Sequence, residues 1–167
     1  LALAGDGTVV GAEQGTGRLL AVRGGEVEVL ATGLTQPVGV ALDPDGTPLV
    51  AESGAGRIVR AAGGRTDTVV DQLSCPQGIL VRGNQLYIVD ATAKELLAVD
   101  LATGQRQRIA TGLPVGSPPG VQPKPLKGMP PFSGPQGPFA GITAGPDGTL
   151  YLSADGDGSV LALRRTR

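Results

Sequence analysis

The chain has 167 residues, and its 14 Lys and Arg nearly balance its 15 Asp and Glu, giving a formal net charge of −1 at pH 7. Nucleic acid binding requires a strongly basic surface, and a membrane-spanning helix requires about 20 consecutive apolar residues. The sequence has neither, so we expect no nucleic acid and no membrane partner. Histidine is absent, which excludes Ser-His-Asp and Cys-His catalytic groups and imidazole metal ligands from this chain.

Glycine and proline set the secondary-structure class. The chain holds 28 Gly and 14 Pro, while 40% of its residues are hydrophobic and occur in short runs between the glycines. Many short apolar segments separated by Gly and Pro turns predict an all-β fold. The single cysteine, Cys75, excludes an internal disulfide and leaves the compartment open. We favour a periplasmic or secreted location over a cytoplasmic one.

Taken in chain order, the predicted strands form four units. The first unit, residues 1–34, begins with an inner strand at 1–4. The second, 35–73, has strands at 38–42, 49–52 and 57–61 and an outer strand at 68–73. The third covers 74–113. The last, 138–167, has strands at 141–144, 150–153 and 160–163 and then no outer strand. All four belong to a single region, 1–167.

The period of the turns identifies these units as repeats. Asp6, Asp45 and Asn84 lie in successive turn tetrads, and each is 39 residues from the next. A period near 40 with about four strands per unit is typical of β-propeller blades. We therefore predict four antiparallel blades. Because the last blade lacks its outer strand, we expect them to be part of a six- or seven-bladed ring, or of a ring assembled from more than one copy. A compact four-bladed ring with one short blade is the alternative.

Two stretches carry a family resemblance. Residues 37–46 read PVGVALDPDG and residues 51–59 read AESGAGRIV, which closely resembles the NHL repeat. Segments 13–19, 90–96 and 155–160 resemble it more loosely. The resemblance implies a propeller of the broad superfamily that includes regucalcin and gluconolactonase-like proteins. That superfamily mixes lactonases, lyases, sugar dehydrogenases and binding modules, so it implies a fold more than a reaction.

The gluconolactonase-like members suggest a specific test of enzymatic function. The resemblance implies six blades and a divalent cation at the axis, with an Asn ligand just before the glycine of each P-x-G opening. The corresponding positions here are Val38, Gln77 and Ala140, and none is Asn. Whether the chain is an enzyme therefore stays open, and no catalytic residue is assigned. A fragment of a lactonase-like or sugar-metabolising hydrolase that uses Ca²⁺ or another divalent cation is the alternative function.

Inter-blade loops and second-strand ends share one face of a propeller, and this face is the candidate site. The ligand-binding candidates that it gathers are Glu13, Glu52, Gln77, Asp90 and Asp155. Four carboxylates around an axis offer the oxygen ligands that Ca²⁺ prefers. The alternative, which we favour, is that each carboxylate accepts hydrogen bonds from its own glycine-rich turn.

A proline-rich insertion, 114–137, separates the third and fourth units. Other junctions leave two residues between the closing Leu and the next Pro, whereas here there are 24. Met129 and Phe132 lie within it and complete the list of ligand-binding candidates. Long loops in compact domains are often functional, so we expect either a lid or partner-binding arm, or a structural strap.

These observations favour a binding or scaffold module. Its binding face would be formed by the inter-blade loops and the insertion, and would take a small molecule or a protein. Its further partner would be a second copy of the chain, or upstream blades that complete the ring.

Overall fold

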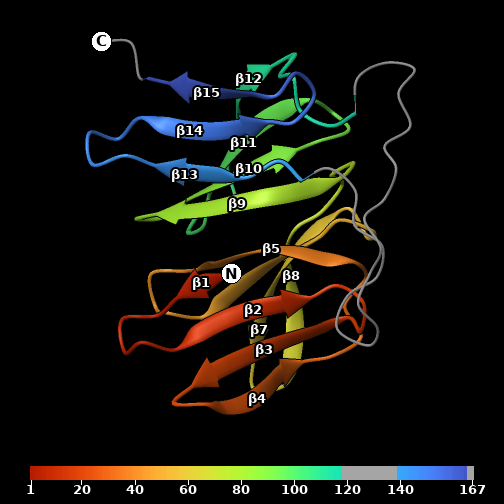
Figure 1. Cartoon of the computed structure of the whole chain (residues 1–167), viewed down its shortest axis with the longest axis vertical. Helices are drawn as coiled ribbons and strands as arrows, with labels where there is room; N and C mark the ends of the chain where they lie inside the picture. The colour runs from red at the N-terminus through yellow and green to blue at the C-terminus, as the bar shows by residue number, and fades with distance from the viewer. Residues whose placement is uncertain (118–138, 165–167) are drawn as a thin grey trace.

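The structure is a computed structural model that describes residues 1–117 and 139–164. Its described part consists of 15 β-strands and their turns, arranged in four sheets (Figure 1). The first sheet contains β1 (Ala2–Leu3), β2 (Val9–Glu13), β3 (Arg18–Arg23) and β4 (Glu26–Ala31). The second contains β5 (Pro37–Leu42), β6 (Pro48–Glu52), β7 (Arg57–Ala62) and β8 (Arg65–Val70). The third contains β9 (Pro76–Arg82), β10 (Gln85–Asp90), β11 (Glu95–Asp100) and β12 (Arg106–Thr111). The last contains β13 (Ile142–Ala144), β14 (Leu150–Ala154) and β15 (Ser159–Leu163).

Every sheet is an antiparallel meander whose strands follow one another in chain order. The predicted all-β, four-bladed propeller is therefore confirmed, including a last sheet with three described strands. The ring beyond these four blades stays a prediction. No helix in the described ranges is long and apolar enough to cross a membrane.

One strand lies three residues earlier than the sequence predicts. We expected the outer strand of the second blade at 68–73, whereas β8 spans Arg65–Val70. The reason is the turn at Gly63 and Gly64, both at positive φ, which is tight enough for Ala62 to pair with Arg65 at once. Pairing therefore begins directly after the turn.

The P-x-G openings bring neighbouring inner strands into close contact. A Cβ on Gly39 would lie 2.1 Å from the backbone oxygen of Gln77, and one on Gly78 would lie 2.5 Å from that of Ala140. Only glycine permits this approach. The motif therefore acts as a spacer that seats each inner strand against the next one.

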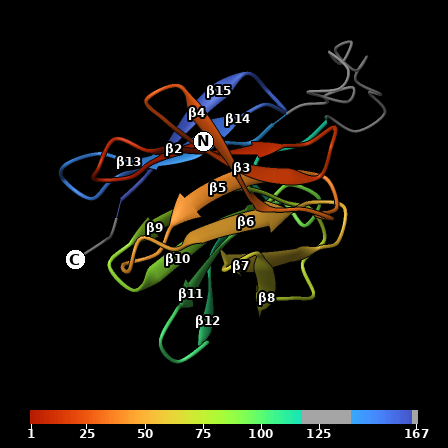
Figure 2. The same cartoon turned by 90° about the horizontal axis from the view of Figure 1, so that it is seen from below.

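Apolar side chains fill the spaces between consecutive sheets. Val50 and Val59 of the second sheet pack with Leu19 of the first, and Ile88 of the third packs with Ile58 of the second. A third cluster joins the third and last sheets, and contains Leu96 and Leu152 among others. Contacts between sheets thus run from first to second, second to third and third to last. In Figure 2 the outer strands β8 and β12 lie farther from the centre than β5 and β9, as the splay of a propeller requires.

Candidate ligand-binding site

A cavity of about 920 Å³ opens where the first three sheets and the start of the insertion meet. One part of its wall is polar and comes from the inter-blade loops, the start of β9 and the turns after the second strands. It contains Gln36, Ser53, Cys75, Gln77, Thr92 and Lys94. The other part is apolar and comes from the open face of the first sheet. It contains Leu1, Val9, Leu20 and Val22. The cavity therefore offers polar groups at one end and hydrocarbon at the other, as small-molecule sites commonly do.

Glu52 is fully buried and does not line this cavity. Its Oε1 accepts a hydrogen bond of 2.6 Å from the backbone N–H of Thr35, and its Oε2 accepts one of 2.7 Å from Nε of Arg57. The carboxylate thus joins the end of β6 to the preceding inter-blade loop and to β7. Ligand binding by Glu52 stays a prediction, and its present bonds are structural.

Asp90 plays the same part in the third sheet, where it is 1% exposed. Its Oδ2 accepts from the N–H of Ser74 at 2.6 Å, and its Oδ1 accepts from the N–H groups of Cys75 and Ala93 at 2.9 and 3.1 Å. Three backbone donors therefore compensate the buried charge. Like Glu52, this side chain lies behind the cavity wall.

Asp155 reaches a similar bond from a different position. Strand β14 ends at Ala154, which pairs with Ser159 as Glu52 pairs with Arg57, so Asp155 lies one residue past the strand end. Its Oδ1 nevertheless accepts a 2.8 Å hydrogen bond from the N–H of Gly116 in the preceding loop. The carboxylate anchors that loop to the last sheet.

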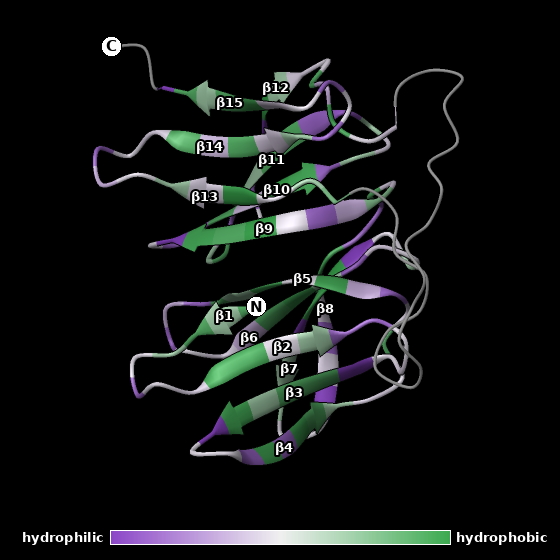
Figure 3. Ribbon diagram, viewed as in Figure 1, coloured by the Kyte–Doolittle hydropathy of each residue, from purple (hydrophilic) through white to green (hydrophobic). Residues whose placement is uncertain are grey.

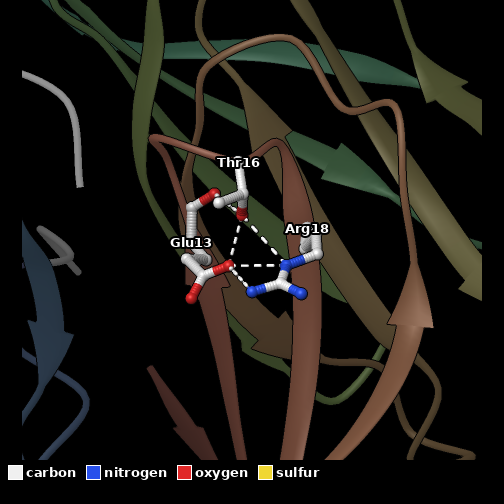
Figure 4. A network of polar contacts seen from close by, with 3 residues as sticks. All are labelled: Glu13, Thr16 and Arg18. Atoms are coloured by element: carbon white, nitrogen blue, oxygen red, sulfur yellow. Dashed lines mark hydrogen bonds and ion pairs between the residues drawn. The ribbon is translucent and has the colours of Figure 1, made fainter. Parts of the chain in front are cut away.

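Glu13 differs from the other three because it lies on the cavity wall. It accepts a hydrogen bond from Oγ1 of Thr16, and pairs with Arg18 at 2.6 Å and 2.7 Å to Nη2 and Nε (Figure 4). The hydrogen bond from Thr16, followed by that from Arg18, lowers the pKa of Glu13 below its usual range. Glu13 is therefore ionised at neutral pH, and its charge is balanced by Arg18.

Gln77 and Cys75 lie together on the polar wall. Oε1 of Gln77 accepts a 2.8 Å bond from the N–H of Ala140, and its Nε2 lies 3.9 Å from the Cys75 sulfur. Burial raises the pKa of the Cys75 thiol above its ordinary value. The thiol is thus protonated at neutral pH, which does not favour a nucleophilic role.

Lys94 lies on the cavity wall but is not among the ligand-binding candidates that the sequence predicts. Its φ is +57°, and it lies in the turn position that is occupied by Gly17, Gly56 and Gly158 in the other three sheets. A left-handed conformation costs a non-glycine residue about 1–2 kcal/mol. The signal was present in the repeat alignment, as a lysine at a glycine position.

Gln36 is a second residue of this kind on the cavity wall, with φ +49°. Gln72, with φ +57°, is the third non-glycine residue at positive φ among those described, and it does not line the cavity. Backbone strain of this kind gathers at functional sites. Two of the three non-glycine residues at positive φ line the cavity, which supports a functional role for it.

Two further predictions from the sequence are a site for a divalent cation and ligand binding by residues of the insertion. Among residues 1–117 and 139–164, no group of three or more His, Cys, Asp or Glu side chains lies close enough to hold a metal ion. Met129 and Phe132 lie outside the described residues. The described start of the insertion is well anchored, because Val115 is fully buried and the carbonyl of Pro114 accepts a 2.9 Å bond from the N–H of Gly156.

Comparison with solved structures supports the propeller assignment. Virginiamycin B lyase from Staphylococcus aureus matches with a TM-score of 0.65 at 14% identity, covering 98% of this chain and 54% of that one. A gluconolactonase from Xanthomonas campestris matches with a TM-score of 0.71 at 20% identity, covering 96% of this chain and 55% of that one. The chain has a β-propeller fold.

A nidogen/laminin complex also matches, with a TM-score of 0.59 at 16% identity, covering 95% of this chain and 78% of that one. The chain spans about half the length of the lyase and the gluconolactonase. No protein-family model matches the sequence, and no curated protein matches it. The likeness is one of fold, and the NHL assignment stays a prediction.

Proposed function

We propose that this chain is a ligand-binding propeller module whose loop-end cavity takes a small amphipathic carboxylate. The observation that carries the proposal is Lys94, a strained cation on the cavity wall at a position where the other sheets have glycine. A lysine retained at such a cost favours a role for its side chain over one for its backbone.

The charges around the cavity support an anionic ligand. Lys94 and Glu13 have the two charged side chains on its wall, and Glu13 is already paired with Arg18. Asp90, under the same turn as Lys94, is compensated by three backbone N–H groups. The Lys94 ammonium is therefore the charge that a ligand carboxylate would complement.

The apolar part of the wall suggests the rest of the ligand. Leu20 and Val22 line the cavity from strand β3, and the half-exposed Phe139 lines it from the loop before β13. An aryl or alkyl body would bury hydrocarbon there, at about 25 cal/mol per Å² removed from water. Gln36 and Ser53 supply polar groups that would fix the orientation of the carboxylate.

Isothermal titration calorimetry with 3-phenylpropionate and its uncharged amide, 3-phenylpropionamide, tests this function. We expect the wild-type chain to bind the carboxylate at least about tenfold more tightly than the amide, because a hydrogen bond to a charged group contributes about 1.5–3 kcal/mol. Lys94→Met should remove that preference and Lys94→Arg should keep it. If neither probe binds to the wild-type chain, the proposal is wrong.

Lys94→Gly separates binding from stability. Glycine adopts positive φ without strain, so this variant should lose the carboxylate preference while its free energy of unfolding stays equal or rises by up to about 1 kcal/mol. Arg65→Met, at an exposed cation outside the cavity, is the matched control and should leave the preference unchanged. Urea unfolding provides the stability measurement.

The hydrolase alternative concerns a ring with blades beyond these four. The described residues contain no cluster of metal ligands that would serve it. Thermal unfolding with and without millimolar Ca²⁺ distinguishes the two functions. The binding proposal predicts an unchanged Tm, whereas a Ca²⁺-dependent rise would favour the hydrolase.

A further inference from the structure

Gln36 lies on the polar wall of the cavity in an unusual backbone conformation. Its φ is +49°, in the left-handed region that non-glycine residues seldom adopt. The residue at the same place in the next inter-blade loop is Cys75, which also lies two positions after the closing leucine and directly before a proline. Cys75 does not have a positive φ, so this loop position does not require the strain. The strain therefore favours a role for the Gln36 side chain.

The backbone at Gln36 is held by hydrogen bonds from the turn after β6. Its carbonyl accepts one from the N–H of Ser53 at 3.1 Å and one from Oγ of Ser53 at 2.9 Å. The third sheet keeps the first kind of bond, from the N–H of Ala91 to the Cys75 carbonyl at 3.0 Å, but alanine has no hydroxyl that could add the second. The second sheet therefore holds this residue more firmly than the third sheet does.

The same turn makes room for the Gln36 side chain. A Cβ on Gly54 would lie 3.1 Å from Oε1 of Gln36, 3.2 Å from its Cβ and 2.9 Å from Cγ2 of Thr35. In the third sheet the equivalent of Gly54 is Thr92, which interacts with the short side chain of Cys75. Gln36 and Gly54 are thus matched to each other, as Cys75 and Thr92 are.

The hydrogen-bonding groups of Gln36 and Ser53 do not suit a carboxylate alone. The Ser53 hydroxyl donates its proton to the Gln36 carbonyl, so it offers only an acceptor to the cavity. The Gln36 carboxamide offers both a donor and an acceptor, and no group within residues 1–117 and 139–164 hydrogen-bonds to it. A carboxylate accepts hydrogen bonds and cannot donate them. A ligand that satisfies this part of the wall must therefore bring a donor of its own.

We propose that the ligand of the cavity is an N-acylated amino acid, whose amide lies against Gln36 and Ser53 while its carboxylate meets Lys94. The inference rests on the proposed carboxylate function and extends it. A secondary amide carries the N–H donor and the carbonyl acceptor that complement a carboxamide. A free α-amino group is less suitable, because its ammonium would lie beside the carboxylate and so near the like charge of Lys94. The amino acid side chain would reach the apolar wall, where hydrophobic residues predominate along β2 and the middle of β3 (Figure 3).

Calorimetric titration with N-acetyl-L-phenylalanine, 3-phenylpropionate and 3-phenyllactate tests the inference. These probes share the carboxylate and the phenyl group, and the α-carbon carries an amide, a hydrogen or a hydroxyl, respectively. We expect the wild-type chain to bind N-acetyl-L-phenylalanine at least about fivefold more tightly than 3-phenylpropionate, because the amide adds two neutral hydrogen bonds. Gln36→Leu should reduce this ratio of affinities to about one and leave the affinity for 3-phenylpropionate unchanged.

Gln72→Leu is the matched control. Gln72 is also an exposed glutamine at positive φ, +57°, and it does not line the cavity, so this variant should keep the full ratio. Gly54→Ala displaces the Gln36 carboxamide without removing it, and should lower the ratio as Gln36→Leu does. Circular dichroism must show the native fold for each variant.

Lys94→Met separates this inference from the function on which it rests. It should weaken the binding of 3-phenylpropionate and of N-acetyl-L-phenylalanine alike, and leave their ratio unchanged. A wild-type ratio near one, together with Lys94-dependent binding of 3-phenylpropionate, would overturn the amide inference and leave the carboxylate function intact. Tighter binding of 3-phenyllactate than of N-acetyl-L-phenylalanine would also overturn it, because a hydroxyl would then be the preferred donor.

Discussion

Lys94 and Gln36 show how a repeat fold reveals a functional position. Both have positive φ and both line the cavity, although a glycine serves the Lys94 position in every other sheet. The fold does not require a strained residue at the Lys94 position, because glycine forms the same turn in the other three sheets. The strain at Lys94 therefore points to a role for its side chain.

The acidic residues show the limit of the same reasoning. The sequence predicts that Glu52 and Asp90 end second strands, and they do. Which way each carboxylate points depends on backbone N–H groups of a preceding loop, such as that of Thr35, and these are 16 or 17 residues away. Such long-range partners have no local pattern in the sequence.

Gly39 provides a prediction at this scale. Gly39→Ala should lower the free energy of unfolding by about 1–3 kcal/mol, because its Cβ would lie 2.1 Å from the Gln77 backbone oxygen and force neighbouring inner strands apart. Gly5→Ala is the matched control, since nothing lies within 4 Å of a Cβ there and its φ is not positive. Urea unfolding monitored by circular dichroism measures both. Equal losses in the two variants would contradict the spacer role.

At the scale of elements, the turns were well predicted because their chemistry is local. Asp43 accepts bonds from the N–H groups of Asp45 and Thr47, and Asp147 accepts one from Thr149. Strand order and the four units followed from the period of these turns. The outer strand β8 was misplaced because the Gly63-Gly64 turn sets its start, while the hydrophobic pattern alone extends to Leu73.

The turn carboxylates predict a pH dependence. Hydrogen bonds from Thr8, Thr103, Thr149 and Ser159 are the largest causes that lower the pKa values of Asp6, Asp100, Asp147 and Asp157, respectively. The unfolded chain then binds protons more readily, so this stability is fully present above the unfolded pKa of about 4. It is lost as pH falls through the lower folded values. Urea midpoints should be flat from pH 7 to 5 and should fall below pH 4, and a midpoint that rises on acidification would contradict the assignment.

At the scale of the whole molecule, the four sheets were predictable, while the completion of the ring stays a prediction. The 39-residue period fixed the number of blades, and the three-stranded last sheet follows from it. The cavity was not predictable in detail, because Leu20 of the first sheet and Lys94 of the third line the same cavity only through the packing of both sheets on the second.

Carboxylate binding through Lys94, in the cavity at the loop end, can be observed residue by residue. Two-dimensional amide NMR of the chain during titration with 3-phenylpropionate tests it most directly. We expect saturable shifts concentrated at Ser53, Cys75 and Lys94, with the amides of the outer strand β8 unmoved. Shifts that are absent, or that are largest on β8, would contradict it.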